Sequence, residues 1–531
     1  MMNTQPLSAT VSGARASSLG DLLRRSAARQ PAKTALIDGA TELSYAEFDL
    51  AVNRLANALI ASGVTPGSRV ALISRNCWQF AVTAFATARA GAILVPINFM
   101  LTADEIAFLL SDATPVAVLA QTPFVATADR AVAAAGLPVP ARIEIPAPGA
   151  AAADRDGWRA FAEALGEGAD DEPGVVVAED DPVRIMYTSG TESRPKGVVH
   201  SSRSLTSEYL SCIVDGGMTA DDVELHTLPF YHCAQLDCFL GPDIALGVTS
   251  IILPGPDPAT VLRTIAERRV TKFFAPPTVW IALLRHPDFA ETDLSSLSKG
   301  YYGASAMPVE ILREIQERLP QLRLWNFYGQ TELAPVATIL PPHEQVSHAG
   351  SAGRPVLHVE TRLMDDDGNF LAPGEVGEVV HRGPQIALGY WNNPAQTAEA
   401  FQGGWFHSGD LGVFDAEGRL SIVDRKKDMI KTGGENVASR EVEEVLYEHP
   451  AIAEVAVFAT PHPKWVETVT AAVVLRAGAT TTVEELRSHA RSFLAPFKVP
   501  TLVHILESLP KNPSGKILKR ELREQLVATV V

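Results

Sequence analysis

The sequence predicts an α/β protein with more than one domain, and three observations lead to this prediction. The chain has 531 residues, which is too long for a single hydrophobic core. Up to about residue 275, buried-strand patterns alternate with helical patterns, as in parallel sheets covered on both faces. The pattern then changes at Gly353 and again near Asp424. We therefore expect a large N-terminal domain over residues 1–424 and a small α+β domain over residues 425–531.

The first elements follow from local signals. Residues Ser44 to Glu47 have the spacing of a capping box and open a helix that stops at Gly63. A buried strand is expected at 69–73, followed by a helical pattern and a strand at 92–96. Further strands are expected at 183–187, 226–230, 249–253 and 272–275.

The second half of the chain has a different character. Short strands and Gly/Pro turns from Gly353 to Val423 predict a small β-rich subdomain. Beyond it, Ser439 is expected to cap one helix and Thr482 to open another. Strands are expected between these helices, at 453–458 and 471–475.

Composition narrows the possible partners and the location. A net charge of −17 argues against nucleic acid as a partner. The most apolar window, Phe80 to Pro96, is too short to span a bilayer, so no transmembrane segment is expected. The four cysteines lack the spacing of a disulfide framework or a zinc site. Buried free thiols and a cytoplasmic location are therefore expected.

The most informative segment is Tyr187 to Gly197, where hydroxyl side chains, a glycine and a lysine follow a strand-like run. Open backbone N–H groups, hydroxyl donors and the charge of Lys196 could together hold phosphate oxygens. The segment is not a P-loop, because Gly197 rather than Ser or Thr follows Lys196. By itself it could equally be a solvated turn.

Four further segments contain residues suited to a nucleotide site. Thr331 and Glu332 follow an apolar run, where a hydroxyl could meet phosphate and a carboxylate could meet magnesium. Asp410 lies in a Gly-rich turn, where a carboxylate could accept ribose hydroxyls. A dense run of charges from Asp424 leads into two glycines, and a rigid Pro/Gly turn near the C-terminus ends in Lys516.

In this order, the five segments resemble those of the adenylate-forming superfamily, and the resemblance spans about residues 20–525. The chain looks most like the fatty-acyl- and other acyl-CoA synthetases. The resemblance implies an N-terminal domain of two αβαβα-type sheets with the β-rich subdomain at about 353–423, then a mobile C-terminal domain. It also implies ATP, Mg²⁺ and coenzyme A. A carboxylate first attacks the ATP α-phosphorus and releases pyrophosphate, and the CoA thiol then displaces AMP.

The resemblance also implies residue roles. The phosphate loop comprises Thr188, Ser189, Gly190, Thr191 and Lys196. The adenine and the α-phosphate are assigned to Gly303, Ala304, Ser305, Tyr328, Gly329, Gln330 and Thr331. Glu332 would bind the metal, Asp410 and Arg425 the ribose, and Lys516 the transition state. Lys427 occupies the hinge position, and Lys431, Gly433, Gly434 and Glu435 would serve thioester formation.

The phosphate loop departs from the common pattern at Glu192 and Ser193, where most relatives have Thr-Gly. Glu192 adds negative charge beside a phosphate site. We expect Glu192 to point outward, so that the loop still functions.

The acid is expected to be hydrophobic. Amino-acid-activating relatives place an aspartate where this chain has His232, so an ammonium group would lack its partner here. Asp237, five residues later, is not expected to reach the same place. His232 could flank the acyl–thiol path or lie packed in the core. The expected pocket walls are Phe230, Tyr231, His232, Cys233, Gln235, Trp280 and Phe327.

The leading interpretation is therefore an AMP-forming acyl-CoA ligase, with His232, Thr331, Glu332 and Lys516 as the catalytic residues. Two alternatives stay open. The enzyme could deliver acyl-AMP to a carrier protein or a separate thiolation partner, or the chain could be a catalytically silent binding protein. A homodimer also stays open. The retained Glu332, Asp410, Arg425 and Lys516 argue against the silent alternative.

Overall fold

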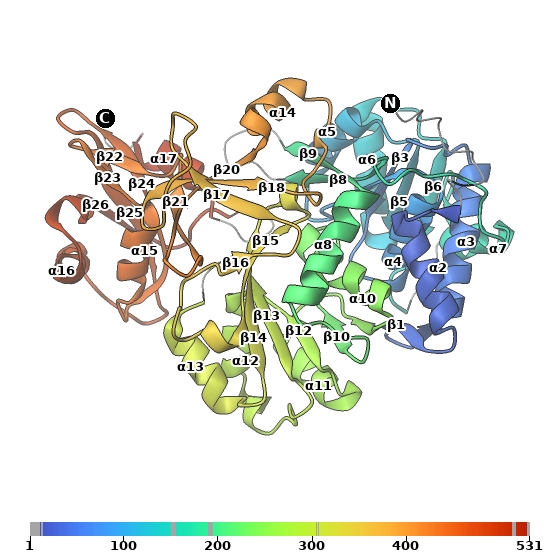
Figure 1. Ribbon diagram of the computed structural model, residues 1–531, viewed down its shortest axis with the longest axis horizontal. Coiled ribbons are helices and arrows are strands. Elements are labelled where there is room, and N and C mark those ends of the chain that lie inside the picture. The colour runs from blue at the N-terminus through green and yellow to red at the C-terminus, as the bar shows by residue number, and fades with distance from the viewer. Residues whose placement is uncertain are drawn as a thin grey trace, which may run out of the picture. The chain divides into compact units, whose positions relative to one another are not determined.

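The computed structural model describes residues 11, 14–149, 155–188, 195–303, 305, 307–511 and 517–527. The chain divides into two compact units (Figure 1). Unit 1 consists of Met1–Thr188, Pro195–Thr361 and Arg382–Gly404, and unit 2 of Ser189–Arg194, Arg362–His381 and Trp405–Val531.

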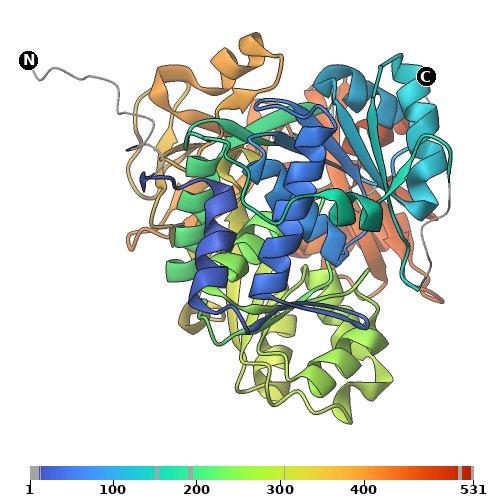
Figure 2. The same ribbon diagram turned by 90° about the vertical axis from the view of Figure 1, so that its right-hand side faces the viewer.

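Unit 1 contains an eight-stranded mixed sheet in the order β19-β9-β8-β4-β3-β5-β6-β7. Its strands are β3 (Arg69–Ile73), β4 (Ile93–Ile97), β5 (Ala117–Gln121), β6 (Ala141–Ile145), β7 (Arg159–Ala160), β8 (Pro182–Thr188), β9 (Lys196–Ser201) and β19 (Gly389–Tyr390). Helices α3 (Tyr45–Ala61) and α4 (Trp78–Arg89) pack on one face, and α5 (Ala103–Ala113) and α6 (Val125–Ala135) on the other (Figure 2).

A nine-stranded sheet forms the rest of the framework of unit 1, in the order β16-β15-β14-β13-β12-β10-β11-β1-β2. Its strands are β1 (Thr34–Asp38), β2 (Thr41–Ser44), β10 (Val223–His226), β11 (Thr249–Ile252), β12 (Lys272–Phe274), β13 (Lys299–Gly303), β14 (Arg323–Gly329), β15 (Val336–Leu340) and β16 (Arg354–Pro355). Helices α11 (Pro258–Arg268), α12 (Pro277–Arg285) and α13 (Val309–Arg318) pack on one face of this sheet (Figure 1).

The opposite face of the nine-stranded sheet packs against a helical layer that also contacts the eight-stranded sheet. This layer contains α2 (Leu19–Arg29), α8 (Ser202–Asp215), α9 (Cys233–Gln235), the π-helical turn η2 (Leu236–Leu240) and α10 (Gly241–Leu246). Two shorter helices of unit 1 are α7 (Phe161–Glu167) and α14 (Pro394–Ala400). Strands that run parallel end at the same edge of a sheet, so the ends of β10, β12, β13 and β14 lie together.

Unit 2 has two smaller sheets. The first has the order β17-β18-β20-β21, with β17 (Glu360–Met364), β18 (Val376–Arg382), β20 (Phe406–Phe414) and β21 (Leu420–Arg425). The second has the order β23-β22-β25-β24, with β26 (Leu502–Leu506) on β25. Its other strands are β22 (Ile430–Thr432), β23 (Glu435–Val437), β24 (Ile452–His462) and β25 (Val466–Leu475). The helices are α15 (Ser439–Tyr447), α16 (Val483–Phe493) and α17 (Lys519–Val527).

The two sheets of unit 1 and the smaller α+β part confirm the predicted fold class. The capping box at α3 is present, because the Glu47 amide donates to the Ser44 hydroxyl at 3.2 Å and the Ser44 amide donates to the Glu47 carboxylate at 2.8 Å. Thr482 likewise caps α16. The expected cap at Ser439 is wrong by one residue. Ala438 is the N-cap of α15, and Ser439 instead hydrogen-bonds to the buried Asp424.

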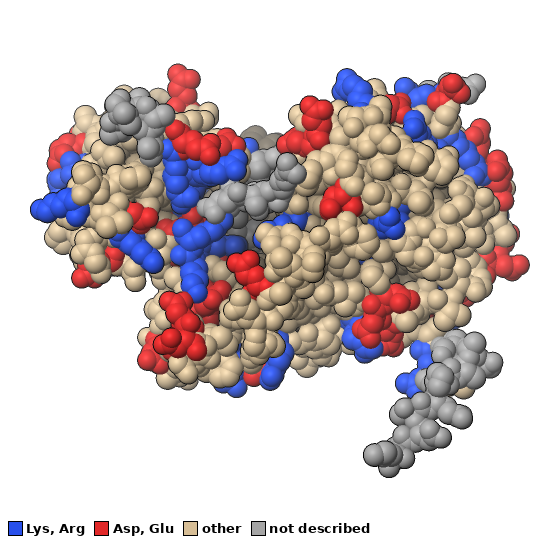
Figure 3. Space-filling view, turned by 90° about the horizontal axis from the view of Figure 1, so that it is seen from above, with Lys and Arg blue, Asp and Glu red and all other residues tan. Residues whose placement is uncertain are grey.

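Three further observations concern composition. All four cysteines are buried and free, as predicted. Among the described residues, no helix combines the length and apolar character needed to cross a bilayer. On the face drawn in Figure 3, acidic and basic side chains are interspersed, so the described part of this face presents no continuous field of one sign.

Candidate active site

The end of β14 places a hydroxyl and a carboxylate side by side. Thr331 and Glu332 follow Gly329 and are both half-buried. A side chain at Gly329 would overlap the carbonyl oxygen of Pro335, because its Cβ would lie 1.9 Å away. The glycine therefore allows the chain to turn tightly here and present Thr331 and Glu332 beyond the sheet.

Tyr390 fixes the carboxylate of Glu332. Its hydroxyl donates to Glu332 Oε1 at 2.8 Å, and the Glu332 carbonyl accepts from the Ala387 amide. Burial raises the pKa of Tyr390, and the charge of Glu332 raises it further, so the tyrosine remains a donor. Among the described residues, Oε2 of Glu332 has no hydrogen-bond partner, which leaves a hard oxygen ligand for a cation such as Mg²⁺.

Lys196 belongs to the same group. It begins β9 and pairs with Thr188 at the end of β8, so the phosphate loop connects the ends of an antiparallel pair. The Lys196 ammonium lies 5.1 Å from the centroid of the Tyr390 ring. The structure therefore brings Lys196 and Glu332 together through one tyrosine, although they are 136 positions apart in the printed sequence.

The predicted adenine segment lies at the neighbouring strand ends. Gly303 ends β13 beside Phe327 of β14, and its Cβ would lie 2.6 Å from the Phe327 carbonyl oxygen. Tyr328 is half-buried, Ser305 is exposed, and the Gln330 amide donates to the Pro335 carbonyl. These residues lie at one sheet edge, as expected for a shared ligand site.

His232 and Cys233 connect this edge to the helical layer. The Cys233 sulfur lies 3.4 Å from the Thr331 hydroxyl, and burial raises the pKa of Cys233 to about 12. His232 Nδ1 accepts from the Ala234 amide, so the neutral ring carries its proton on Nε2. Desolvation by the surrounding protein lowers the pKa of His232, although the residue as a whole is exposed.

The predicted pocket walls do not pack together as one group. Phe327 lies in an aromatic cluster, where the Phe239 ring stacks on it at 5.7 Å and on Phe274 at 4.3 Å. Tyr231 packs edge-on against Phe99. Phe230 and Gln235 are fully buried, Phe230 against Phe80 and Gln235 hydrogen-bonded to His226.

Trp280 is not brought to the other wall residues. It packs on Phe273, which points to the opposite face of β12 from Phe274 because strand side chains alternate.

Asp237 is unavailable to a substrate ammonium. It is fully buried, forms an ion pair with Arg184 and accepts from the Tyr209 hydroxyl at 3.2 Å. The charge of Asp237 is thus balanced by Arg184 within the core, which agrees with the expectation that Asp237 does not serve an amino-acid substrate.

In unit 2, Asp410 and Arg425 are brought together. They occupy opposite positions on β20 and β21, and Arg425 Nε lies 2.6 Å from Asp410 Oδ1. Asp410 is 3% exposed and Arg425 is half-buried. The pair therefore presents one carboxylate with a fixed orientation.

The predicted hinge and thiolation residues follow in the same unit. Lys427 is exposed in the turn after β21, and Lys431 is exposed on β22. Gly433 and Gly434 form the turn before Glu435, with φ of 60° and 90°, and the Gly433 amide donates to Trp465. Five predicted site residues lie outside the described residues: Ser189, Gly190, Thr191, Ala304 and Lys516.

Sequence reasoning missed Tyr390 and the Phe239–Phe274 pair. Tyr390 lies on a two-residue strand that pairs with β9, so no local periodicity indicates its position. Phe239 lies in the π-helical turn, four residues beyond the predicted wall residue Gln235. The aromatic run from Phe239 to the β12 and β14 residues becomes a cluster only through the tertiary fold.

Two segments of the chain match known families. Residues 23–391 match the AMP-binding enzyme family, and residues 441–516 match the AMP-binding enzyme C-terminal domain. The chain therefore belongs to the AMP-binding enzymes of the adenylate-forming superfamily, among the acyl-CoA synthetases.

Curated relatives match over almost their full length. A feruloyl-CoA synthase from Amycolatopsis sp is 37% identical, with 96% of this chain and 99% of the relative covered. The long-chain-fatty-acid–CoA ligase FadD13 of Mycobacterium tuberculosis is 36% identical at the same coverage. An indoleacetate–CoA ligase from Aromatoleum aromaticum is 35% identical, with 96% and 98% covered.

Solved structures have the same fold. A Mycobacterium tuberculosis fatty acyl CoA synthetase superposes with a TM-score of 0.78 at 35% identity, covering 97% of this chain and 99% of its own. The anthranilate CoA ligase AuaEII, in complex with anthranoyl-AMP, superposes with a TM-score of 0.88 at 26% identity, covering 97% and 98%.

Proposed function

We propose that this ATP-dependent acyl-CoA ligase activates a hydrophobic aromatic acid. The main support is the link from Lys196 through Tyr390 to Glu332 beside Thr331. It brings a cation from the eight-stranded sheet close to a carboxylate and a hydroxyl at the end of β14 in the nine-stranded sheet. A nucleoside triphosphate needs these groups, because its phosphates are anionic and are normally bridged by Mg²⁺.

The proposed first step is adenylation. The acid carboxylate attacks the α-phosphorus, the bond to the bridging oxygen breaks, and pyrophosphate leaves. Lys196 holds the outer phosphates and Thr331 hydrogen-bonds to the α-phosphate. Glu332 would hold Mg²⁺, which would neutralise phosphate charge. Lys516 stabilises the charge that develops in the transition state. In unit 2, Asp410 oriented by Arg425 accepts the ribose hydroxyls.

The proposed second step is transfer to coenzyme A. The thiol attacks the acyl carbon and gives its proton to water, the bond from the acyl carbon to the phosphate oxygen breaks, and AMP leaves. His232 is accessible, and its neutral ring carries a proton on Nε2, so it can donate a hydrogen bond along the thiol path. Residues Lys431 to Glu435 serve this step, after a rotation of the proposed C-terminal domain (425–531) about Lys427.

Two features support an aromatic acid. The Phe239, Phe274 and Phe327 rings form a buried aromatic cluster that includes the predicted wall residue Phe327, and the charge of Asp237 is paired with Arg184. Relatives named for feruloyl and indoleacetate groups also favour an aryl acid, whereas FadD13 is named for long-chain fatty acids.

The test is pyrophosphate release with a panel of acids, each with and without CoA, followed by detection of the thioester. The panel contains cinnamate, benzoate, indoleacetate, hexadecanoate and phenylalanine. We expect CoA-dependent thioester formation with at least one aryl acid and none with phenylalanine. Exclusive use of hexadecanoate would overturn the aryl proposal, and pyrophosphate release without thioester would indicate a carrier-protein acceptor.

A further inference from the structure

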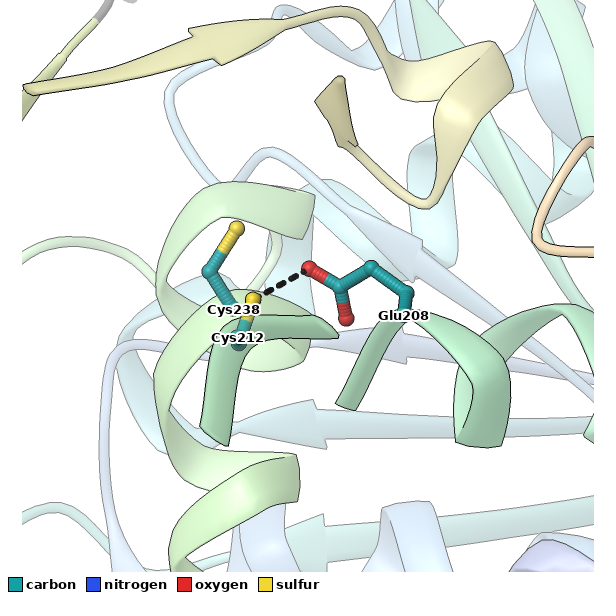
Figure 4. A group of neighbouring side chains, drawn as sticks. All are labelled: Glu208, Cys212 and Cys238. Atoms are coloured by element: carbon teal, nitrogen blue, oxygen red, sulfur yellow. Dashed lines mark hydrogen bonds between the residues drawn. The ribbon is translucent and has the colours of Figure 1, made fainter. Parts of the chain in front are cut away.

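A buried acid and two thiols lie together where α8 and the π-helical turn η2 meet (Figure 4). Glu208 and Cys212 are one helical turn apart on α8, and Cys238 belongs to the π-helical turn η2. One ligand atom from each lies within 4.8 Å of the others, and their exposures are 0%, 0% and 4%. We refer to these three residues as the thiol–acid cluster.

Within the described part of the chain, Glu208 lacks the cationic partner that the neighbouring buried acids have. The neighbouring buried acids have cationic partners: Glu224 and Asp243 pair with Lys272, and Asp237 pairs with Arg184. Glu208 Oε1 accepts from the Cys212 thiol at 3.0 Å, and Cys238 also interacts with the carboxyl group. Among the described residues, Oε2 has no hydrogen-bond partner although it is buried.

Such an atom indicates a missing partner. Buried polar atoms are nearly always hydrogen-bonded, and an exception calls for a ligand or a water. Burial also raises the pKa of Glu208 well above its usual range, so the group is a neutral acid that can donate as well as accept. A ligand hydroxyl can satisfy both properties.

The cluster also lies at a suitable distance from the proposed reaction centre. Cys233, which contacts Thr331 at 3.4 Å, precedes Cys238 by five residues along α9 and η2. At the α-helical rise of about 1.5 Å per residue this corresponds to at most about 7.5 Å along the axis, comparable to the length from a carboxyl carbon across an aromatic ring to a substituent on its far side.

The path between the two ends is aromatic. Phe239 directly follows Cys238, and its ring stacks on Phe274 and Phe327 and meets the edge of Tyr301 at 5.2 Å. The Tyr301 hydroxyl donates to the Gly216 carbonyl just beyond α8, which ties β13 to the helix that carries Glu208. A substrate ring stacked on this wall would point its far edge toward the cluster.

A metal fits the cluster less well. Zinc requires deprotonated thiols and, in structural sites, four ligands, whereas burial raises the pKa of Cys238 well above its usual range. Only three candidate ligands are present among the described residues.

We propose that Glu208, supported by Cys212 and Cys238, forms the far end of the acyl pocket and hydrogen-bonds to a hydroxyl on the ring of an aromatic acid. The inference rests on the proposed aryl-acid function and deepens it. It makes Glu208 a specificity residue, whose effect depends on the substituent and not on the chemistry at the carboxylate.

The test compares acids that differ by one oxygen: cinnamate with 4-hydroxycinnamate, and benzoate with 4-hydroxybenzoate. For the wild type we expect kcat/KM to favour the hydroxylated member of at least one pair by about tenfold or more. Glu208→Leu should reduce that ratio to near one, mainly by lowering kcat/KM for the hydroxylated acid. Glu208→Gln, which can still hydrogen-bond, should keep part of the preference.

Glu144→Gln is the matched control. Glu144 is 1% exposed on β6, and neither of its carboxylate oxygens has a hydrogen-bond partner among the described residues, yet it lies in the other sheet. It should leave the ratio unchanged. If Glu208→Leu does not fold, Cys238→Ala, which removes the neighbouring thiol, provides the second variant and should also reduce the ratio.

The outcomes separate the two proposals. No activity with any aryl acid, while hexadecanoate is activated, would refute the proposed acid class. Equal wild-type activity with both members of each pair, or an unchanged ratio in Glu208→Leu, would refute only the role of Glu208. Stoichiometric zinc in the purified protein that is lost in Cys238→Ala would also overturn it in favour of a metal site.

Discussion

Replacing Tyr390 by phenylalanine should raise the Mg²⁺ concentration that adenylation requires. The substitution removes the hydroxyl that donates to Glu332 Oε1 at 2.8 Å and keeps the ring beside Lys196. Without this hydrogen bond, the Glu332 side chain can rotate away from the position in which it would bind a metal. Tyr390 is therefore a positioning residue in this proposal.

The expected magnitude follows from the type of hydrogen bond. A hydrogen bond to a charged group contributes about 1.5–3 kcal/mol. Because both side chains are half-buried, we take the lower end, about 1.5 kcal/mol. This corresponds to a roughly tenfold increase in the Mg²⁺ concentration that gives half-maximal adenylation. The maximal rate at saturating Mg²⁺ should fall less, since Thr331 and Lys196 are unchanged.

The assay is pyrophosphate release as a function of Mg²⁺ at fixed ATP and acid. Tyr45→Phe is the control, because the Tyr45 hydroxyl donates to a backbone carbonyl, that of Val248, at 2.7 Å in a fully buried region away from β14. It should lower stability without changing the Mg²⁺ midpoint. An unchanged midpoint in Tyr390→Phe, together with a raised one in Glu332→Gln, would refute the reasoning.

Three further predictions follow. Asp237→Leu leaves Arg184 buried without its ion-pair partner, so the free energy of unfolding measured in urea should fall by about 3–5 kcal/mol. The double variant Arg184→Met/Asp237→Leu should recover most of this loss, and an equal loss in both variants would contradict the prediction. Burial lowers the pKa of His200 to about 3 from 6.5, so only the unfolded chain gains that proton as pH falls below about 6.5. The free energy of unfolding should therefore decrease from about pH 6.5 toward pH 3, and His200→Gln should flatten this dependence in urea titrations; an identical slope would contradict it. Lys516→Ala should abolish acyl-AMP formation but leave thioester formation from supplied acyl-AMP largely intact, as measured by separate half-reaction assays; equal loss of both would contradict its role.

Local signals predicted the framework of the fold well. The Ser44 and Thr482 caps and the strand at 69–73 are set by residues within one or two turns, so the sequence displays them directly. The cap at Ser439 failed because a tertiary partner, Asp424, takes the side chain that would otherwise have capped α15.

The site was predictable only in part. Thr188 and Lys196 border one recognisable loop, and Thr331 and Glu332 form another segment, so both could be found before the fold was known. Tyr390 could not, since its contact with Glu332 depends on the pairing of β19 with β9. Trp280 is a residue type that suits a pocket wall, but it packs on Phe273. Phe273 points to the face of β12 opposite to Phe274, because side chains alternate along a strand.

Two groups of buried polar residues near Phe239 should respond differently to substitution, one through stability and the other through substrate choice. The Phe239 ring stacks on Phe274, and Lys272, 5.8 Å from the Phe239 ring, is neutralised by Glu224 and Asp243. Breaking such a pair leaves an uncompensated buried charge, so substitutions there should mainly reduce stability. Glu208 has a thiol instead of a cation, and removing its neutral carboxyl group leaves no buried charge behind. Substitution at Glu208 should therefore change which acid is accepted at little cost in stability, a contrast that unfolding and substrate-ratio measurements on the same variants can resolve.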